Sequence, residues 1–178
     1  MHLLFEDDGQ LKAGTILADN DSSLQVEAAT GKRLKIKAAA VLLRFTAPSP
    51  SALVAEAQQL ASALDPDFLW EVSGADEFGF DELALEYYGH APAPAEAAAV
   101  AYALAAVPMY FYKRGKGRYR QAPPDALKAA LASVERRKRE AEQVERWVAE
   151  LAQGCLPEAL QAKTVALLHR PDKQSLEW

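Results

Sequence analysis

The chain has 178 residues, of which half are apolar and a quarter are charged, and its formal net charge is −5. This composition is typical of a folded protein with a substantial core, and it excludes a wholly disordered chain. No apolar run approaches the roughly 20 residues that span a bilayer, so a transmembrane protein is excluded as well. The acidic residues after Phe5 argue against a secretory signal, and the single cysteine, Cys155, favours a reducing compartment. We therefore expect a cytoplasmic protein without a membrane partner.

Charge is distributed unevenly along the chain. Residues 1–45 contain six basic and six acidic residues, whereas residues 46–111 contain ten acidic residues and no Lys or Arg. Residues 112–178 contain fourteen basic and nine acidic residues. The small net charge thus conceals a polarised molecule, and net charge alone is a poor guide to its partners.

Residues 1–46 predict a small β-barrel of SH3-like type. Turn signals at residues 8–9, 20–22 and 30–32 separate short runs in which apolar and polar residues alternate. Residues 41–45 form a further, almost entirely apolar run. Four or five short strands in this length are typical of a small barrel. Its core would be small, so we expect it to pack against the rest of the chain.

Residues 51–122 predict helices followed by a hairpin. After a proline-containing linker, we expect an alanine-rich helix capped by Ser51, followed by helices over residues 67–72, 80–88 and 95–107. Residues 109–112 and 118–120 are then predicted to form strands around a glycine-containing turn. This order is that of a winged helix-turn-helix domain with a basic wing.

Residues 123–170 predict a helical hairpin that leads to a further domain. Apolar residues recur at helical spacing from about 125 to 153, Gly154 ends this helix, and a shorter helix over residues 157–168 folds back on it. The pairs Glu135–Arg139 and Arg136–Glu140 predict a salt-bridged, solvent-exposed face. Residues 169–178 look incomplete, so we expect the chain to continue. The fold class predicted for the whole chain is α+β.

The strongest candidate binding motif is the basic, aromatic hairpin. Basic side chains neutralise phosphates, and aromatic rings stack on unpaired bases. Alternate hairpin residues share a face, so we expect Tyr112 and Tyr119 on one surface with basic residues at its edge. The alternative is that the rings are hairpin core and the charges a solvated turn. The candidate RNA-binding residues are Tyr112, Lys113, Arg114, Lys116, Arg118, Tyr119 and Arg120.

A second basic strand lies in the predicted barrel. Arg33, Lys35 and Lys37 alternate with apolar residues and share one face. Lys35 and Lys37 are therefore further candidates for binding single-stranded RNA. The alternative is an edge strand that its charges protect from pairing with other chains.

The remaining polar residues give no sign of catalysis. Asp65, Asp76 and Asp81 stand where helices are expected to begin, so helix capping explains them. The histidines and the cysteine lack zinc-ligand spacing. No nucleophile motif or phosphate-binding glycine loop is present. We therefore predict no catalytic residue, metal or cofactor within this chain.

Several segments together resemble a known family. Residues 111–120 (FYKRGKGRYR), residues 122–127 (APPDAL) and the charged helix after them resemble the N-terminal region of bacterial RNase II-family (RNB-domain) exoribonucleases. The similar versions carry a helix-turn-helix region before the catalytic domain. Residues 3–6 (LLFE), the turn at 31–33 and residues 41–45 look like the opening of the same family. The resemblance spans most of the chain.

The resemblance implies a guide for single-stranded RNA. In that family the catalytic domain hydrolyses RNA from the 3′ end, with Mg²⁺ held by a cluster of aspartates. That aspartate motif does not occur in these 178 residues. The implied role is therefore an inactive, substrate-guiding region, whose partners are single-stranded RNA and its own catalytic domain beyond Trp178.

Two other functions stay open. A winged-helix DNA-binding regulator needs a recognition helix with long polar side chains, and residues 95–107 offer almost only alanine with Glu96 and Tyr102. This composition disfavours base reading. A protein-interaction module would instead use the acidic middle of the chain and the alanine-rich helix to pack on a partner.

Overall fold

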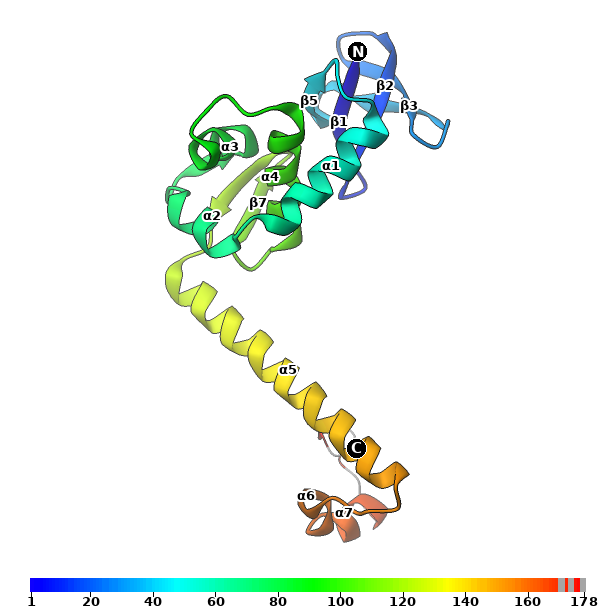
Figure 1. Ribbon diagram of the computed structural model, residues 1–178, viewed down its shortest axis with the longest axis vertical. Coiled ribbons are helices and arrows are strands. Elements are labelled where there is room, and N and C mark those ends of the chain that lie inside the picture. The colour runs from blue at the N-terminus through cyan, green and yellow to red at the C-terminus, as the bar shows by residue number, and fades with distance from the viewer. Residues whose placement is uncertain (170–171, 173–174, 177–178) are drawn as a thin grey trace. The chain divides into compact units, whose positions relative to one another are not determined.

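The computed structural model describes residues 1–169, 172, 175 and 176. They form a mixed α+β structure, as predicted (Figure 1). The chain divides into two compact units, residues 1–123 and 124–178. The predicted end of the helical hairpin at residue 170, and most of the segment 169–178, lie outside the described residues.

The first unit begins with a five-stranded antiparallel sheet in the order β4-β3-β2-β1-β5. Its strands are β1 (His2–Asp7), β2 (Gln10–Asp19), β3 (Ser23–Ala28), β4 (Arg33–Lys37) and β5 (Val41–Phe45). The turn between β1 and β2 forms as the sequence predicts, because Asp8 (φ 49°) and Gly9 (φ 75°) both adopt the positive φ of a two-residue hairpin loop.

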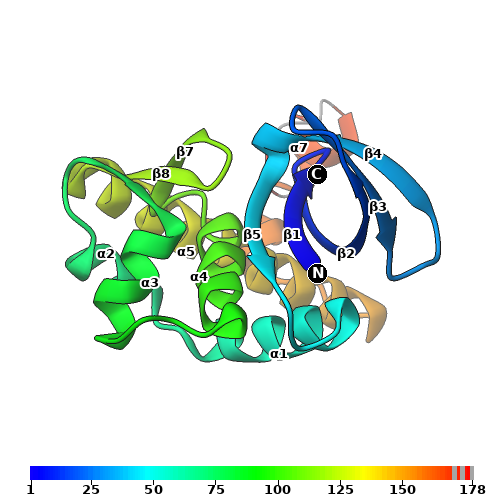
Figure 2. The same ribbon diagram turned by 90° about the horizontal axis from the view of Figure 1, so that it is seen from above.

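The sheet is curved (Figure 2) but open, so the expectation of a closed barrel is wrong. A one-turn 3₁₀ helix, Ala38–Ala40, carries the chain from β4 to the opposite edge, where β5 pairs with β1. Over residues 1–45, β4 and β5 do not pair with each other. Both are edge strands of five residues, and β4 pairs with β3 whereas β5 pairs with β1.

Both faces of this sheet are buried near its centre. Leu3 and Phe5 on β1 point to one side and form a core with Leu24, Val26 and Ile36. Leu4 points to the other side, into a second core that helices cover. The alternation along β1 therefore places successive residues in two different cores.

Four helices follow the sheet: α1 (Pro50–Ala63), α2 (Pro66–Val72), α3 (Phe80–Tyr88) and α4 (Pro94–Ala106). The N-cap of α1 is Ser49, whose hydroxyl accepts a hydrogen bond from the Ala52 N–H at 3.4 Å. Ser51 was the predicted cap, but Pro50 occupies the first helical position, so the cap is Ser49, two residues earlier.

Of the three carboxylates predicted to cap helices, one does so and two do not. Asp65 caps α2 as expected, and its Oδ1 accepts from the Asp67 N–H at 2.9 Å. Asp76 and Asp81 are not caps, because α3 begins after Gly79, whose N–H donates to Glu82 Oε2 at 2.7 Å. At its other end α3 stops as predicted at Gly89, which adopts a left-handed conformation (φ 69°).

The alanine-rich helix α4 is the centre of the first unit. Eight of its thirteen residues are buried, including Ala98, Ala99 and Val100 without exposed surface. α4 packs against α1 and β5, and small side chains allow this close approach. Leu4 and Phe45 of the sheet share one core with Leu53 of α1 and the α4 alanines. The expected packing of the sheet on the rest of the chain is confirmed.

A second, three-stranded sheet follows in the order β6-β8-β7. It consists of β6 (Glu77–Gly79), β7 (Phe111–Gly115) and β8 (Arg118–Gln121). The hairpin of β7 and β8 was predicted, although β7 begins at Phe111 rather than at Met109. β6 was not predicted, and it pairs with β8 so that Phe78 lies opposite Tyr119.

The second unit contains α5 (Pro124–Ala152), α6 (Glu158–Gln161) and α7 (Thr164–His169). On α5 the exposed pairs Arg139–Glu135 (3.0 Å) and Arg136–Glu140 (3.8 Å) form as predicted. The single helix predicted over residues 157–168 is instead divided in two, because the Leu160 carbonyl accepts from the Lys163 N–H and from the Thr164 hydroxyl. None of the helices in the described residues has the length and apolarity to cross a membrane.

Candidate nucleic-acid interface

The β7–β8 hairpin, which carries most of the candidate residues, is fixed at its turn. Gly117 has a positive φ of 70° and lies against Leu42 and Phe80. Its carbonyl accepts a hydrogen bond from the Phe80 N–H at 3.0 Å. A register shift between Lys113 and Gly115 adds a bulge on β7. The turn is therefore anchored to α3 and to the first sheet.

The two tyrosines of the hairpin lie on opposite faces. Tyr112 pairs with Arg120, and Lys113 pairs with Tyr119. Directly opposite residues of a hairpin share a face. Tyr112 therefore shares one face with Arg120, and Tyr119 shares the other face with Lys113. Tyr119 is only 4% exposed, whereas Tyr112 is 39% exposed. The expectation of one shared aromatic surface is therefore wrong. On the face of Tyr119, β6 places Phe78 opposite Tyr119, and this face is part of the core.

Two of the five basic residues of the hairpin are held by carboxylates. Lys113 Nζ lies 2.7 Å from Glu6 Oε1, and the Glu6 side chain is only 11% exposed. Arg118 Nε lies 2.6 Å from Glu77 Oε1, and this hydrogen bond raises the pKa of the guanidinium further. Both cations are thus partly neutralised within the chain.

The other basic residues of the hairpin have no carboxylate partner among the described residues. Arg120 Nε donates only to the Ala75 carbonyl at 3.3 Å, and Lys116 Nζ only to the Glu6 carbonyl at 3.5 Å. Arg114 is exposed at the bulge. We define the basic hairpin surface as the set of exposed residues Tyr112, Arg114, Lys116 and Arg120. It combines an accessible aromatic ring with three uncompensated positive charges.

The second candidate group lies elsewhere. Lys35 and Lys37 are exposed on β4, with Ile36 buried between them, and β4 is an edge strand. In Figure 2, β4 and the β7–β8 hairpin lie on opposite sides of the first unit. The structure therefore does not bring Lys35 and Lys37 together with the basic hairpin surface.

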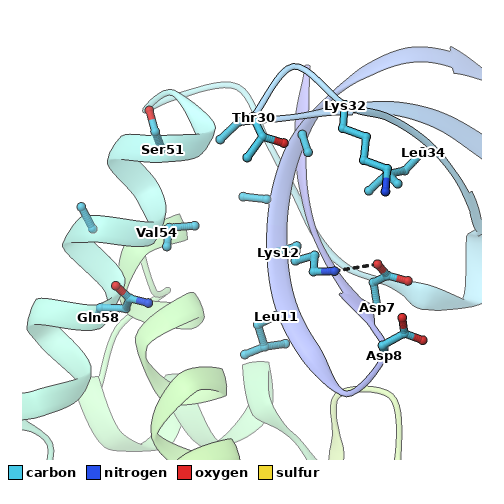
Figure 3. Close-up of a pocket in the computed structure, with 14 residues that line it drawn as sticks. Asp7, Asp8, Leu11, Lys12, Thr30, Lys32, Leu34, Ser51, Val54 and Gln58 are labelled. Carbon is cyan, nitrogen blue, oxygen red and sulfur yellow. Dashed lines mark hydrogen bonds and ion pairs between the residues drawn. The ribbon is translucent and has the colours of Figure 1, made fainter.

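A cavity that the sequence did not reveal lies between the first sheet and α1 (Figure 3). Its volume is about 650 Å³, and Leu11, Leu34 and Val54 form its apolar part. The ion pair between Lys12 Nζ and Asp7 Oδ2, at 2.8 Å, lies at one side. No local motif marks this cavity, because three separate segments of the chain line it.

The structure offers no cation site in the part that it describes. No three residues among His, Cys, Asp and Glu gather there in a way that would hold a metal ion. Several acidic residues of segment 46–111 serve instead as caps or as ion-pair partners, as Asp65 and Glu77 do. Within the described residues, the acidic side chains therefore do not fit a Mg²⁺ site. The family resemblance places Mg²⁺ in a separate catalytic domain.

Comparison with known proteins found no match. No protein-family model, curated protein sequence or solved structure matches it. Its function therefore has to be inferred from its own residues, and above all from the basic hairpin surface.

Proposed function

We propose that this chain binds single-stranded RNA through the basic hairpin surface. The observation that carries the proposal is that Arg114, Lys116 and Arg120 are exposed on the same hairpin as the exposed Tyr112, which pairs with Arg120, and that none of the three has a carboxylate partner among the described residues. Guanidinium and ammonium groups attract phosphates, and an exposed ring stacks on an unpaired base. Contacts of this kind bind single strands with little regard to sequence.

We further propose that this binding guides RNA to a hydrolytic 3′–5′ exoribonuclease domain of the RNase II family, which requires Mg²⁺. The support is the resemblance of residues 111–120 and 122–127 to the guiding region of such enzymes. The absence of Lys and Arg from residues 46–111 adds to it, because ten acidic residues there repel RNA and leave the hairpin as the favoured contact. The chain itself would be catalytically inactive.

The finer fold assignments belong to the same proposal. The strand order β4-β3-β2-β1-β5, with a 3₁₀ turn before the last strand, supports an SH3-like relationship despite the open sheet. The succession of β6, α3, α4 and a hairpin that pairs with β6 supports a winged helix-turn-helix. A cytoplasmic location fits the single, unpaired Cys155.

A winged-helix DNA regulator is the less favoured alternative. The helix that would read bases is α4, and eight of its residues are buried in the core. A protein-interaction module remains the alternative if RNA does not bind.

The test is a salt titration of binding to a fluorescent single-stranded RNA, followed by anisotropy. The variant Arg114→Ala/Lys116→Ala/Arg120→Ala should reduce the slope of log K against log salt by about 2, because each phosphate contact contributes about 0.7. A charge-matched control, Lys128→Ala/Arg137→Ala/Lys138→Ala on α5, should leave the slope unchanged. Tyr112→Ala should weaken binding with little change in slope, because stacking releases no counterions.

Equal binding by the hairpin variant and the wild type at every salt concentration would refute the hairpin as the interface. The variant Lys35→Ala/Lys37→Ala then shows whether β4 carries the binding. If that variant also binds normally, or if the wild type does not bind RNA, the RNA-guiding function is refuted.

A further inference from the structure

A second cavity lies beside the basic hairpin surface. It has a volume of about 470 Å³ and is bordered by the C-terminal part of α4, by β7 and by the turn at Gly9. This volume falls in the range of small-molecule sites, which is roughly 300–1,000 Å³. Tyr112 of the basic hairpin surface forms part of its wall.

The walls of this cavity are mostly apolar. Leu104 and Phe111 are buried residues whose side chains line it, and Pro108 and Ala105 add further apolar surface. Such walls favour a ligand with apolar faces. Lys113 also lines the cavity, and its ammonium is already held by Glu6.

The Tyr119 hydroxyl gives the cavity a polar group without a partner. Tyr119 lines the cavity and is only 4% exposed, yet the described residues offer its hydroxyl no hydrogen-bond acceptor. No fully buried side-chain oxygen in the described residues lacks a partner, so this hydroxyl reaches an accessible surface. Burial and the nearby Glu6 carboxylate raise the pKa of Tyr119 to about 12. The hydroxyl is therefore a hydrogen-bond donor at neutral pH.

These features together select a class of ligand. A flat ring system with acceptors on its edge fits the apolar walls formed by Leu104 and Pro108, with its edge toward the Tyr119 hydroxyl. An alkyl chain would leave that hydroxyl unsatisfied, and a sugar would place its own hydroxyls against apolar walls, both of which cost free energy. A nucleobase meets both requirements.

We propose that this cavity takes one unstacked nucleobase of the RNA strand that lies on the basic hairpin surface, with the Tyr119 hydroxyl donating to an acceptor on the edge of the base. The inference rests on the proposed function and adds a base-binding site to its phosphate contacts. It also gives the buried Tyr119 a role in binding that does not require its ring to be exposed.

The first experiment uses nucleosides, which carry no phosphate. Uridine and adenosine are titrated into the full chain, and chemical shifts of Leu104, Ala105 and Lys113 are followed by NMR. We expect shifts at these residues with a nucleoside and none with ribose 5-phosphate. Tyr119→Phe should weaken nucleoside binding about two- to tenfold, which is the net effect of one neutral hydrogen bond.

The matched control is Tyr110→Phe. Tyr110 is also buried, but its hydroxyl donates to Asp67 Oδ1 at 2.8 Å, and it does not line the cavity. This variant should bind nucleosides like the wild type. Well-dispersed NMR spectra of both variants show that each still folds.

The second experiment separates this site from the proposed function. An RNA with one abasic position at the bound site should bind more weakly than the intact strand, with the same salt slope. Normal RNA binding without nucleoside shifts, and with Tyr119→Phe binding like the wild type, would overturn the base site and leave the RNA-guiding function standing. Nucleoside shifts at the cavity without any RNA binding would overturn the RNA-guiding function and support a nucleobase site.

Discussion

Tyr110 is a buried residue whose hydroxyl connects the start of the hairpin region to α2. It donates to Asp67 Oδ1 at 2.8 Å, and burial together with this carboxylate raises its pKa from 10 to about 12. Removal of the hydroxyl should therefore lower the free energy of unfolding. We expect Tyr110→Phe to cost about 1.5–3 kcal/mol in urea denaturation, as for a hydrogen bond to a charged group.

The raised pKa of Tyr110, caused first by burial and then by the bond to Asp67, makes stability depend on pH in the alkaline range. Unfolded Tyr110 loses its proton near pH 10 and folded Tyr110 near pH 12, so the folded state binds more protons between these values. The contribution of Tyr110 is therefore complete below pH 10 and is lost as pH rises to 12. Tyr110→Phe should show a shallower loss of stability over this range than the wild type. The prediction is contradicted if the free energy of unfolding falls equally steeply with pH in Tyr110→Phe and in the wild type.

Gly117 is needed at the hairpin turn for two separate reasons. Its φ is 70°, and a Cβ there would lie 2.9 Å from Leu42 Cδ2. Gly31 has a similar φ of 78° but nothing within 4 Å, so Gly31→Ala measures the backbone cost alone. That cost is about 1–2 kcal/mol, and Gly117→Ala should cost at least about 1 kcal/mol more because Leu42 must move. If Gly117→Ala and Gly31→Ala lose equal stability in thermal denaturation, the Leu42 side chain moves aside without a measurable cost.

At the level of elements, α4 is constrained by its neighbours on nearly every side. Ala99 has no exposed surface and belongs to the core shared by the first sheet and α1. Ala99→Leu should overpack this core and destabilise the protein by about 1–3 kcal/mol. Ala106→Leu, on the exposed end of the same helix, is the control and should change stability little. Unchanged melting temperatures of both variants would mean that the core accommodates a larger side chain.

The elements that the sequence predicted are those with a local signal. Two adjacent residues with positive φ make the turn at Asp8 and Gly9, and Gly89 alone ends α3. β6 was missed because three residues carry no periodicity, and its strand exists only through pairing with β8. The division of α6 from α7 depends on one hydroxyl, that of Thr164, which competes for a backbone carbonyl.

The sequence predicted which residues lie on the candidate hairpin, but not how their side chains are buried or paired. The basic and aromatic residues of the hairpin are adjacent in sequence, so their gathering on one hairpin was predictable. The burial of Tyr119 was not, because it follows from the register with β6. The pairing of Lys113 with Glu6 joins residues far apart in the chain, and no local pattern announces it.

The first unit contains the two hydrophobic cores described above. The cores around Leu3 and around Leu4 consist entirely of residues before Pro123. We therefore expect a fragment of residues 1–123 to fold alone and to unfold cooperatively in urea. Trp70, whose Nε1 donates to the Ala122 carbonyl at 3.0 Å, is a fluorescent reporter within this fragment. A gradual, non-cooperative fluorescence change would contradict the prediction.

Under the proposed RNA-guiding function, the ion pair between Glu6 and Lys113 has a kinetic consequence. Glu6 is an internal competitor, since any phosphate that reaches Lys113 must share it with a carboxylate already 2.7 Å away. We expect this competition to shorten the lifetime of a phosphate contact at Lys113. Glu6→Gln removes the competing charge and should lengthen the residence time of bound RNA in stopped-flow dissociation. Glu6 would then affect the rate at which RNA dissociates. It also holds the Lys113 side chain in place.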